Sequence, residues 1–345
     1  MLQAEKIEIK NALEAIEYYY QKGWTDGLPI VPPTEERIYE MLSSVKMEPN
    51  TVIGSISERG RVFTAELVAI NAVMAGCLPG YFPVVMAAAQ AISDPEFGLH
   101  GPSASTHGAA IMIAVNGPIA QQIGMNDGPN AFGPGNRANS TIGRAIRLLM
   151  INAGGSPEFD RSTLGTPAKY SFCFAEKATE WIPLHVQRGY KKEESTVTVF
   201  ACEGPNQIQN HAALKGESIL KTMADRMSPL GSFNIASETE MAVVLCPEHY
   251  HHLEKEGWTK ESVQQFLFEH AVKTLSDMKK GGIIEELISP GDDKIIKHAV
   301  PSPEQILLMV AGGEAGRFSA CMPGWFSYKQ SRAVTKSINS ATGFT

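Results

Sequence analysis

The amino-acid sequence predicts an α/β fold, with α+β as the alternative, in which a duplicated helix–strand–helix–helix unit forms two pseudo-symmetric halves. Short apolar runs of strand length alternate with longer segments of helical length. The same order of elements occurs twice along the chain, with the same residue types at the element ends. These two observations favour two intimate halves over a string of independent domains.

The repeated unit is recognised by its turn residues. In the first copy Pro118 lies just inside a short helix that Gly124 ends, and Pro247 and Gly257 have the same positions in the second copy. Chance agreement between two common αβα sequences is the alternative to duplication. The expected elements are helices 82–93, 119–123 and 141–152 with strand 110–115, and helices 217–227, 248–256 and 260–273 with strand 241–245.

Three regions are expected along the chain. Residues 1–50 form an N-terminal helix and a Pro-rich segment, Trp24 to Thr34, whose prolines keep it extended as a brace across the body. Residues 51–190 form the first half, and residues 191–345 form the second half with a polar C-terminal tail. The tail after Trp325 is expected to be partly disordered or to pack against another subunit of a homo-oligomer.

Composition excludes several classes of function. The chain has 345 residues, of which 43% are hydrophobic and 19% charged, so it can bury a large core. A net charge of −7 without a Lys/Arg cluster argues against nucleic-acid binding. The apolar stretches are too short to span a membrane and the N-terminus lacks the pattern of a signal peptide, which predicts a cytoplasmic protein. The five cysteines contain no CxxC pair and are expected to be free thiols, and no motif identifies a cofactor.

A Gly/Asn-rich loop, residues 125–140, is inserted in the first copy and has no counterpart in the second. A compact protein seldom keeps a long irregular loop without a function. Asn139 or Ser140 is expected to cap the next helix, whose free N–H groups and nearby arginines would bind a carboxylate or phosphate. A rigid lid or a dimer contact is the alternative. The candidate substrate-binding residues here are Asn130, Asn136, Arg137, Asn139, Ser140 and Arg144.

Two histidines lie in a hydroxyl-rich loop before the first repeat strand. His100 and His107 are seven residues apart and could act as an acid/base pair or as metal ligands. A loop histidine is more often exposed or hydrogen-bonded without a catalytic role. His107 is the candidate catalytic residue of the pair, and the two together are the only candidate metal ligands.

The segment Lys169 to Glu176 carries the candidate nucleophile. If the segment is a strand, Lys169, Ser171 and Cys173 share one face, and the cation would lower the pKa of the thiol. Cys173 is then a catalytic nucleophile and Glu176 the nearest acid. The alternative is that Cys173 is a small core residue.

Glycines after apolar strands mark two further candidate sites. In the stretch 312–321, glycines permit a close approach to a ligand, with Arg317 and Ser319 as substrate contacts. Glu203 follows another strand and is a possible catalytic base. The cluster from His249 to His252 is interpreted as a solvated helix face, because it lacks a ligand partner at metal-site spacing.

Four motifs distributed over nearly the whole chain carry a resemblance: Trp24 to Pro29, Gly133 to Asn139, Lys169 to Glu176 and Ala311 to Ser319. Together they resemble a largely uncharacterised bacterial family, loosely associated with UGSC-type thiol or selenol proteins that are similar to the B component of glycine reductase. The UGSC motif itself is absent, and Cys321 stands in Phe318-Ser319-Ala320-Cys321. The resemblance implies an enzyme or enzyme subunit for a small organic substrate.

The sequence therefore predicts an enzyme that cleaves a carbon–heteroatom bond of a small anionic molecule in a cleft between the two halves. Arg137, Arg144 and Arg317 would hold the anion, with Lys169 as a further cation. Two alternatives remain: a non-catalytic scaffold subunit of a thiol or selenol enzyme, and a metal-dependent hydrolase.

Overall fold

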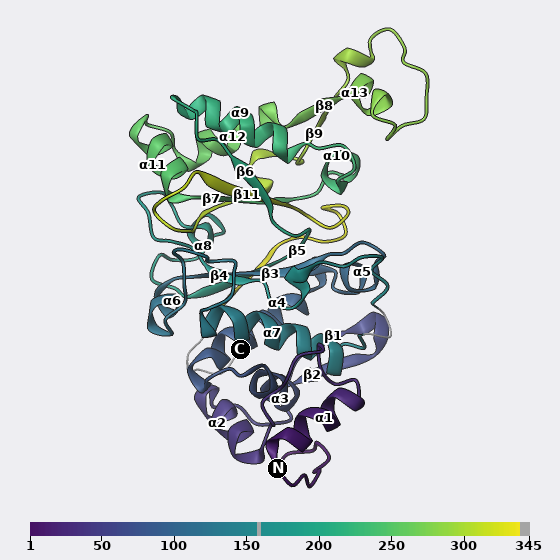
Figure 1. The fold of residues 1–345 in the computed structure, drawn as a ribbon, viewed down its shortest axis with the longest axis vertical. Helices are drawn as coiled ribbons and strands as arrows, with labels where there is room; N and C mark the ends of the chain where they lie inside the picture. Colours follow the sequence, from purple (N-terminus) through teal and green to yellow (C-terminus); the bar gives the residue numbers. More distant parts are fainter. Residues whose placement is uncertain (157–159, 339–345) are drawn as a thin grey trace.

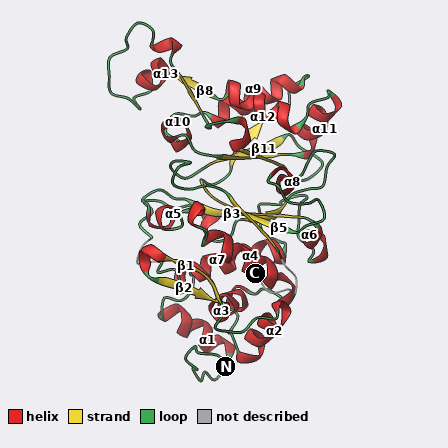
Figure 2. Ribbon diagram, turned by 180° about the vertical axis from the view of Figure 1, so that it is seen from behind, coloured by secondary structure: helices red, strands yellow, loops and turns green. Residues whose placement is uncertain are grey.

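The protein is built from four layers, in which two facing sheets are enclosed between two layers of helices (Figures 1 and 2). A computed structural model describes residues 1–156 and 160–338. Helices and mixed sheets together agree with the predicted α/β or α+β class. The first sheet has the order β12 (Val334–Ser337), β5 (Thr196–Cys202), β3 (Ala110–Asn116), β4 (Cys173–Ala175), and the second β10 (Ile306–Val310), β7 (Met241–Leu245), β11 (Phe318–Pro323), β6 (Asn206–Gln209).

The two sheets have the same pattern of strand directions. β3 is parallel to β4 and antiparallel to β5, and β7 is parallel to β10 and antiparallel to β11. One strand of each sheet is exchanged: β6 follows β5 of the first sheet but pairs with β11 of the second, whereas β12 follows β11 but pairs with β5. This exchange interlocks the two sheets. β5 pairs with β3 although it lies after residue 190, where the first half was expected to end.

The strands and helices expected from the repeat are present. Strands β3 and β7 match the expected ranges, as do α4 (Phe82–Ile92), α9 (Gly216–Met227), α11 (Pro247–Lys255) and α12 (Lys260–His270) to within three residues. α6 (Pro118–Gln122) begins one residue early, and α7 (Arg137–Asn152) begins four residues before the expected start. Common descent of the two halves stays a prediction.

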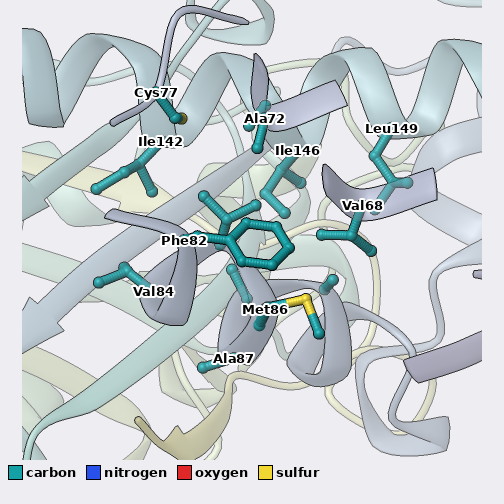
Figure 3. Packing of buried hydrophobic residues seen from close by; sticks show 14 of the residues in the cluster. Val68, Ala72, Cys77, Phe82, Val84, Met86, Ala87, Ile142, Ile146 and Leu149 are labelled. Carbon is teal, nitrogen blue, oxygen red and sulfur yellow. The ribbon is translucent and has the colours of Figure 1, made fainter. Parts of the chain in front are cut away.

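The first helical layer packs on the outer face of the first sheet. α4 and α7 pack directly on the strands of the first sheet, and α3 (Ala65–Ala75), which is apolar on every side, is buried between α7 and the outer helix α2 (Glu35–Val45). Phe82 at the start of α4 is fully buried among Val68, Ile142 and Ile146 (Figure 3). This layer fixes the position of α7 and of the loop that precedes it.

The second helical layer covers the outer face of the second sheet. α9, α11 and α12 pack on the apolar side chains of alternate positions in β7 and β10, such as Val243 and Leu308. Thr259 and Ser262 form a capping box at the start of α12. The intervening positions, such as Val244 and Met309, face the first sheet and form a third core between the sheets.

The remaining elements lie at the edges. The expected brace packs on the body, because the Val31 N–H donates to the Met74 carbonyl oxygen at 3.1 Å. The C-terminal tail was expected to be partly disordered or to pack against another subunit. Its segment β12 instead pairs with β5 of the same chain, and residues 339–345 lie outside the described residues. No described helix has the length and apolar character that crossing a membrane requires. The edge elements are α1 (Ala12–Gln21), β1 (Val52–Ile56), β2 (Arg61–Thr64), α5 (His100–Ala104), α8 (Leu184–Gln187), α10 (Phe233–Ser237), β8 (Val272–Thr274), α13 (Leu275–Lys280) and β9 (Ile296–His298).

Candidate functional site

A pocket of about 530 Å³ lies between the inserted loop of the first half and the glycine-rich turn of the second half. It adjoins the carboxyl ends of the parallel strands β7 and β10, the edge at which α/β sheets usually bind ligands. The first half contributes residues 130–133, and the second half contributes residues 311–313, Ala315 and Gly316. The remaining lining residues are Pro205, Gln207, Val244, Cys246, Phe318, Ser319 and Ala320.

The inserted loop is held in place by side-chain amides. Asn139 accepts a hydrogen bond from the Asn126 N–H at 3.0 Å and donates to the Asn126 carbonyl oxygen at 2.8 Å. The Gly312 N–H donates to the Asp127 carbonyl oxygen at 2.8 Å and so ties this loop to the glycine-rich turn. Asn139 therefore shapes the pocket wall and does not contact the pocket interior.

Ser319 and His249 form a hydroxyl–imidazole pair beside the pocket. The Ser319 Oγ atom lies 2.7 Å from His249 Nδ1, and the other ring nitrogen, Nε2, lies 3.4 Å from the Asn210 carbonyl oxygen. His249 is fully buried and Ser319 nearly so. A carbonyl oxygen can only accept, so Nε2 carries the proton and Nδ1 is free to accept the Ser319 proton. Burial, as the largest cause, lowers the pKa of His249, which keeps the imidazole neutral.

Local sequence explains why these two side chains meet. Pro247 begins α11, and His249 is in its first turn on the face that packs against β11. Ser319 is the second residue of β11 and alternates with Ala320, which faces the other sheet. The pair thus joins one helix and one strand of the second half, and its serine is part of the pocket lining.

Cys246 is the third polar group at this position. It is the N-cap residue of α11, and its N–H donates to Ser319 Oγ at 3.1 Å, while its sulfur lies 3.7 Å from the same oxygen. Burial raises the pKa of the Cys246 thiol, and hydrogen bonds from the His249 backbone and the Ser319 hydroxyl act against this rise. The thiol is therefore protonated at neutral pH, unlike an activated cysteine, whose surroundings lower its pKa.

The interpretation of His249 to His252 as a solvated helix face is wrong for one of these residues. His249 is buried, whereas His251 is exposed and lies 3.6 Å from Glu314. The sequence does contain a signal for His249. This residue lies in the first turn of the helix that begins at Pro247, on the helix face that was expected to pack against the sheet.

The three arginines that were expected to bind an anion do not meet. Arg137 donates twice to the Gly76 carbonyl oxygen, at 3.0 and 2.9 Å. Arg144 forms a bidentate ion pair with Asp26 at 2.8 Å and donates to the Pro29 carbonyl oxygen. Arg317 donates to the carbonyl oxygens of His211 and Ala213. Each guanidinium stabilises a chain turn, so the predicted common anion site is wrong.

The helix cap was also placed too late in the sequence. Asn136, and not Asn139 or Ser140, caps α7, because its Oδ1 accepts the Asn139 N–H at 3.0 Å. The Ser140 N–H donates to the Asn136 carbonyl oxygen within the first turn. Asn130 is the one candidate of this loop that lines the pocket, and it adopts a left-handed backbone conformation with φ of 61°.

Lys169 and Cys173 do not form the predicted pair. β4 begins at Cys173, and Lys169 ends a short 3-10 helix before it, where it binds Asp160 at 2.9 Å. This contact and those with Ser162 keep the pKa of Asp160 far below its usual range, although burial acts in the opposite direction. Cys173 lies in the first core, and burial raises the pKa of its thiol far above the usual value. The core interpretation of Cys173 is the correct one.

Glu176 lies in a buried contact between the halves. Its Oε1 is 3.8 Å from Lys260 Nζ, and its Oε2 accepts the Leu184 N–H at 2.9 Å and a hydrogen bond from Asn116. Burial lowers the pKa of Lys260, and the Glu176 charge acts in the opposite direction. The contacts of Glu176 are structural and lie outside the lining of the pocket.

His107 and Glu203 meet at another end of the sheets. His107 Nε2 lies 3.7 Å from Glu203 Oε1, which accepts the Ser232 hydroxyl at 2.7 Å. His100 instead accepts from Arg59 at 3.2 Å. Within residues 1–156 and 160–338, no group of three or more His, Cys, Asp or Glu side chains is placed to hold a metal ion. Two candidate catalytic residues from separate segments, His107 and Glu203, thus lie together away from the pocket that contains Ser319, whereas His100, the expected partner of His107, contacts Arg59 instead.

The chain has no significant match to a known protein family, a curated protein or a solved structure.

Proposed function

We propose that the chain is an enzyme that cleaves the bond between a carbonyl carbon and a heteroatom in a small organic molecule, with Ser319 as nucleophile and His249 as base. The contact of 2.7 Å between Ser319 Oγ and His249 Nδ1 supports this assignment most directly. A hydroxyl in reach of a base that a third group orients is the general arrangement of an activated nucleophile. Here the Asn210 carbonyl oxygen orients the imidazole.

The reaction proceeds in two stages. Ser319 Oγ attacks the carbonyl carbon, its proton passes to His249 Nδ1, and the carbonyl electron pair moves onto oxygen. The intermediate expels the heteroatom, which takes the proton from Nδ1 and leaves an acylated Ser319. Water then gives a proton to Nδ1 and attacks the acyl carbon, and return of that proton to Ser319 releases the carboxylic acid.

The start of α11 stabilises the negative charge that develops on the carbonyl oxygen. The helix begins at Pro247, next to the Cys246 N–H that contacts Ser319, so its positive end faces the reacting group. Donors placed where charge develops are commonly the largest contribution to acyl-transfer catalysis.

The pocket favours an uncharged substrate instead of the anion that the sequence suggested. Among the described residues that line it, none carries a charged side chain. Phe132 and Phe318 offer aromatic faces, and Asn130 and Gln207 offer amide groups. A charged group in these surroundings loses hydration without gaining an ion pair.

Ser319 is preferred over Cys246 as nucleophile because of their protonation states. Burial raises the pKa of the Cys246 thiol, so it is protonated at neutral pH, and its sulfur lies 3.7 Å from Ser319 Oγ. The serine contacts the base directly. Cys246 supplies its backbone N–H and forms part of the pocket wall.

We further infer that the two halves descend from one duplicated unit and that only the second half kept a site. Ala311 N–H donates to Leu245 at 3.1 Å after β10, and Glu176 N–H donates to Val115 at 3.1 Å after β4. In the first half, the equivalent of Cys246 is Asn116, which binds Glu176. The buried contacts of Glu176 therefore occupy the position that the pocket has in the second half.

A fluorophosphonate probe tests the nucleophile without knowledge of the substrate. Attack by Ser319 displaces fluoride and leaves a phosphonylated serine, which mass spectrometry of peptides locates. We expect labelling of the wild-type protein at Ser319 and at least a 100-fold slower reaction in His249→Gln, following the usual size of general-base effects. Ser228→Ala is the matched control, because Ser228 is a buried serine of the same half that binds only helix carbonyl oxygens.

Hydrolysis of uncharged aryl esters and thioesters is the accompanying activity assay. Loss of hydrolysis in Ser319→Ala but not in Ser228→Ala supports the assignment. Loss in Cys246→Ala with full activity in Ser319→Ala would overturn it. Folded protein that neither reacts with the probe nor hydrolyses any ester supports the alternative of a non-catalytic subunit that partners a thiol or selenol enzyme.

A further inference from the structure

A second space for a ligand lies between α7 and the chain segment 160–171. It has two parts, an outer pocket of about 420 Å³ and an inner cavity of about 40 Å³ that lies against the start of β3. Arg147 and Lys169 line both parts, so these two cations lie at the boundary between them. None of the described residues lines both this space and the pocket of Ser319.

The boundary between the two parts carries an excess of positive charge. Arg147 and Lys169 supply two cations against the single carboxylate of Asp160, which lies 3.1 Å from Arg147 Nη2 and 2.9 Å from Lys169 Nζ. The other charged lining residue, Asp26, is paired with Arg144. One positive charge is thus left without a counter-charge among the described lining residues. An anion with a single charge matches this balance.

Arg147 has the hydrogen-bond donors that such an anion needs. Lys169 Nζ donates to both carboxylate oxygens of Asp160 and to Ser162 Oγ, so its three N–H groups are used. Arg147 donates from Nη2 to Asp160, whereas its Nε and Nη1 have no hydrogen-bond partner among the residues that the structure describes. A guanidinium presents its N–H groups in a planar fork that matches a carboxylate. A ligand carboxylate can therefore bind Arg147 with two hydrogen bonds.

The inner cavity limits what can be attached to that carboxylate. One polar atom of the cavity, Ser156 Oγ, is buried and has no hydrogen-bond partner in the described part of the chain. An unpaired buried hydroxyl is unfavourable, and an oxygen atom of a ligand would remove this cost. At about 40 Å³ the cavity has room for roughly three non-hydrogen atoms. The apolar walls of the cavity include Leu99, Pro102, Ile111, Ile146, Met150 and Phe172.

Arg147 and Ser156 are close enough for one small molecule to contact both. The Ser156 N–H donates to the Met150 carbonyl oxygen at 3.0 Å, which holds Ser156 beside the last turns of α7. Met150 follows Arg147 by three residues, so the two lie on the same face of the helix, and both line the inner cavity. A separation of about one helical turn, roughly 5 Å, is spanned by a chain of a few carbon atoms.

We propose that this space binds a small aliphatic hydroxycarboxylate. Its carboxylate binds Arg147, its hydroxyl binds Ser156, and its short carbon chain lies against the apolar walls of the inner cavity. An apolar cavity with a few polar groups that fix the orientation of the ligand is the usual form of a small-molecule site. The binding does not depend on the proposed cleavage reaction, because Ser319 and His249 line neither part of the space.

Isothermal titration calorimetry of the full chain with 3-hydroxybutyrate tests the site. We expect binding of one molecule per chain with a Kd of about 1 mM or lower. Arg147→Gln is expected to weaken binding at least tenfold, because charge-assisted hydrogen bonds are lost. Arg37→Gln is the matched control, since Arg37 is exposed on α2 and lines neither part of the space. Absence of binding to the wild type, or unchanged affinity in Arg147→Gln, overturns the proposal.

Two analogues of this probe separate the role of the carboxylate from that of the hydroxyl. 1,3-Butanediol has an alcohol in place of the carboxylate and is expected not to bind. Butyrate lacks the hydroxyl and is expected to bind about threefold more weakly or less tightly still. Ser156→Ala should remove the preference for 3-hydroxybutyrate over butyrate without loss of the fold, because the deleted hydroxyl has no partner among the described residues. Butanediol that binds as tightly as 3-hydroxybutyrate contradicts the proposed recognition.

Ser319→Ala distinguishes this site from the proposed active site. Folded Ser319→Ala is expected to bind 3-hydroxybutyrate with the affinity of the wild type, whether or not Ser319 is a nucleophile. Loss of binding in this variant would place the ligand in the pocket of Ser319 and would overturn the proposal. Circular dichroism confirms that each variant is folded.

Discussion

His249 Nδ1 lies 2.7 Å from Ser319 Oγ, and this contact joins a helix and a strand that are 70 residues apart in sequence. The imidazole is fully buried and its second nitrogen is paired with a backbone carbonyl oxygen. A neutral base is thus kept ready beside a hydroxyl at the edge of the pocket. The properties of this imidazole determine how the site responds to pH.

We expect Ser319 to react with the fluorophosphonate at lower pH values than it would if His249 had the pKa of an ordinary histidine. Burial lowers the pKa of His249 below its usual value of 6.5, so the imidazole is protonated at lower pH than an ordinary histidine and keeps its basic function further into the acidic range. The measurement is the rate of fluorophosphonate labelling between pH 4.5 and 8. A midpoint above 6.5 would contradict the buried environment.

The same shift affects stability, and its sign follows from proton binding. Below pH 6.5 the unfolded chain binds a proton at this imidazole more readily than the folded chain does, so the free energy of unfolding decreases as the pH falls. Circular dichroism at each pH is therefore the control that separates loss of the base from loss of the fold.

The Asp26–Arg144 pair is expected to be important for stability and not for the reaction. Both side chains are largely buried and joined at 2.8 Å by two hydrogen bonds. Arg144→Ala leaves the Asp26 carboxylate unpaired and should lower the free energy of unfolding by about 3–5 kcal/mol. Arg144→Lys should also destabilise, because an ammonium cannot make the bidentate contact.

Urea denaturation measures both Arg144 variants, with Arg37→Ala on the exposed surface of α2 as the control. The labelling rate of Ser319 should be unchanged in the folded fraction. If an Arg144 variant has normal stability but loses the labelling of Ser319, then Arg144 is a substrate ligand, as the sequence analysis predicted.

The Glu176–Lys260 contact should behave as a coupled buried pair. Glu176→Gln leaves the Lys260 ammonium without a counter-charge in a site that is 97% shielded, and it should cost about 3 kcal/mol or more. Lys260→Met combined with Glu176→Gln removes both charges and should recover part of this loss. A double-mutant cycle in urea gives the coupling energy, and additive effects would show that the two charges do not interact.

Cys246 should be the first thiol to react in the native protein. It lines the pocket, whereas Cys77 and Cys173 lie in the first core, where burial raises the pKa of Cys77 to about 12. Titration with an aromatic disulfide reagent should show one slow reaction that Cys246→Ala removes. All five thiols should react in concentrated guanidinium chloride.

Cys173→Ala separates the core interpretation of Cys173 from a catalytic one. It should cost only about 1 kcal/mol of stability for the small volume removed, and it should leave the labelling of Ser319 unchanged. Loss of labelling in folded Cys173→Ala would contradict the position of Cys173 in the core.

The elements themselves were predictable because their signals are local. Apolar runs of five to seven residues identified β3 and β7, and Pro118, Pro247 and Thr259 identified helix starts, since capping and proline geometry depend on a few neighbouring residues. The prediction that the inserted loop belongs to a functional site stays a prediction, and residues 130–133 of the loop line the pocket.

The partners of the polar side chains were not predictable, because they come from distant parts of the chain. Arg144 could bind a ligand or a carboxylate, and nothing in its local sequence shows that Asp26 reaches it. Lys169 and Cys173 would share one face only if residues 169–176 formed a single strand. Lys169 instead ends a 3-10 helix, and its side chain binds Asp160.

The sequence by itself indicated most of the longer helices and strands, the repeated order of their signals, and the inserted loop 125–140, because these depend on patterns within a few residues. The tertiary structure decided that the fourth strands are exchanged between the sheets, that the arginines stabilise turns, and that His249 meets Ser319. The physical reason is that a buried polar group must find a partner, and packing of distant elements alone settles which partner is in reach.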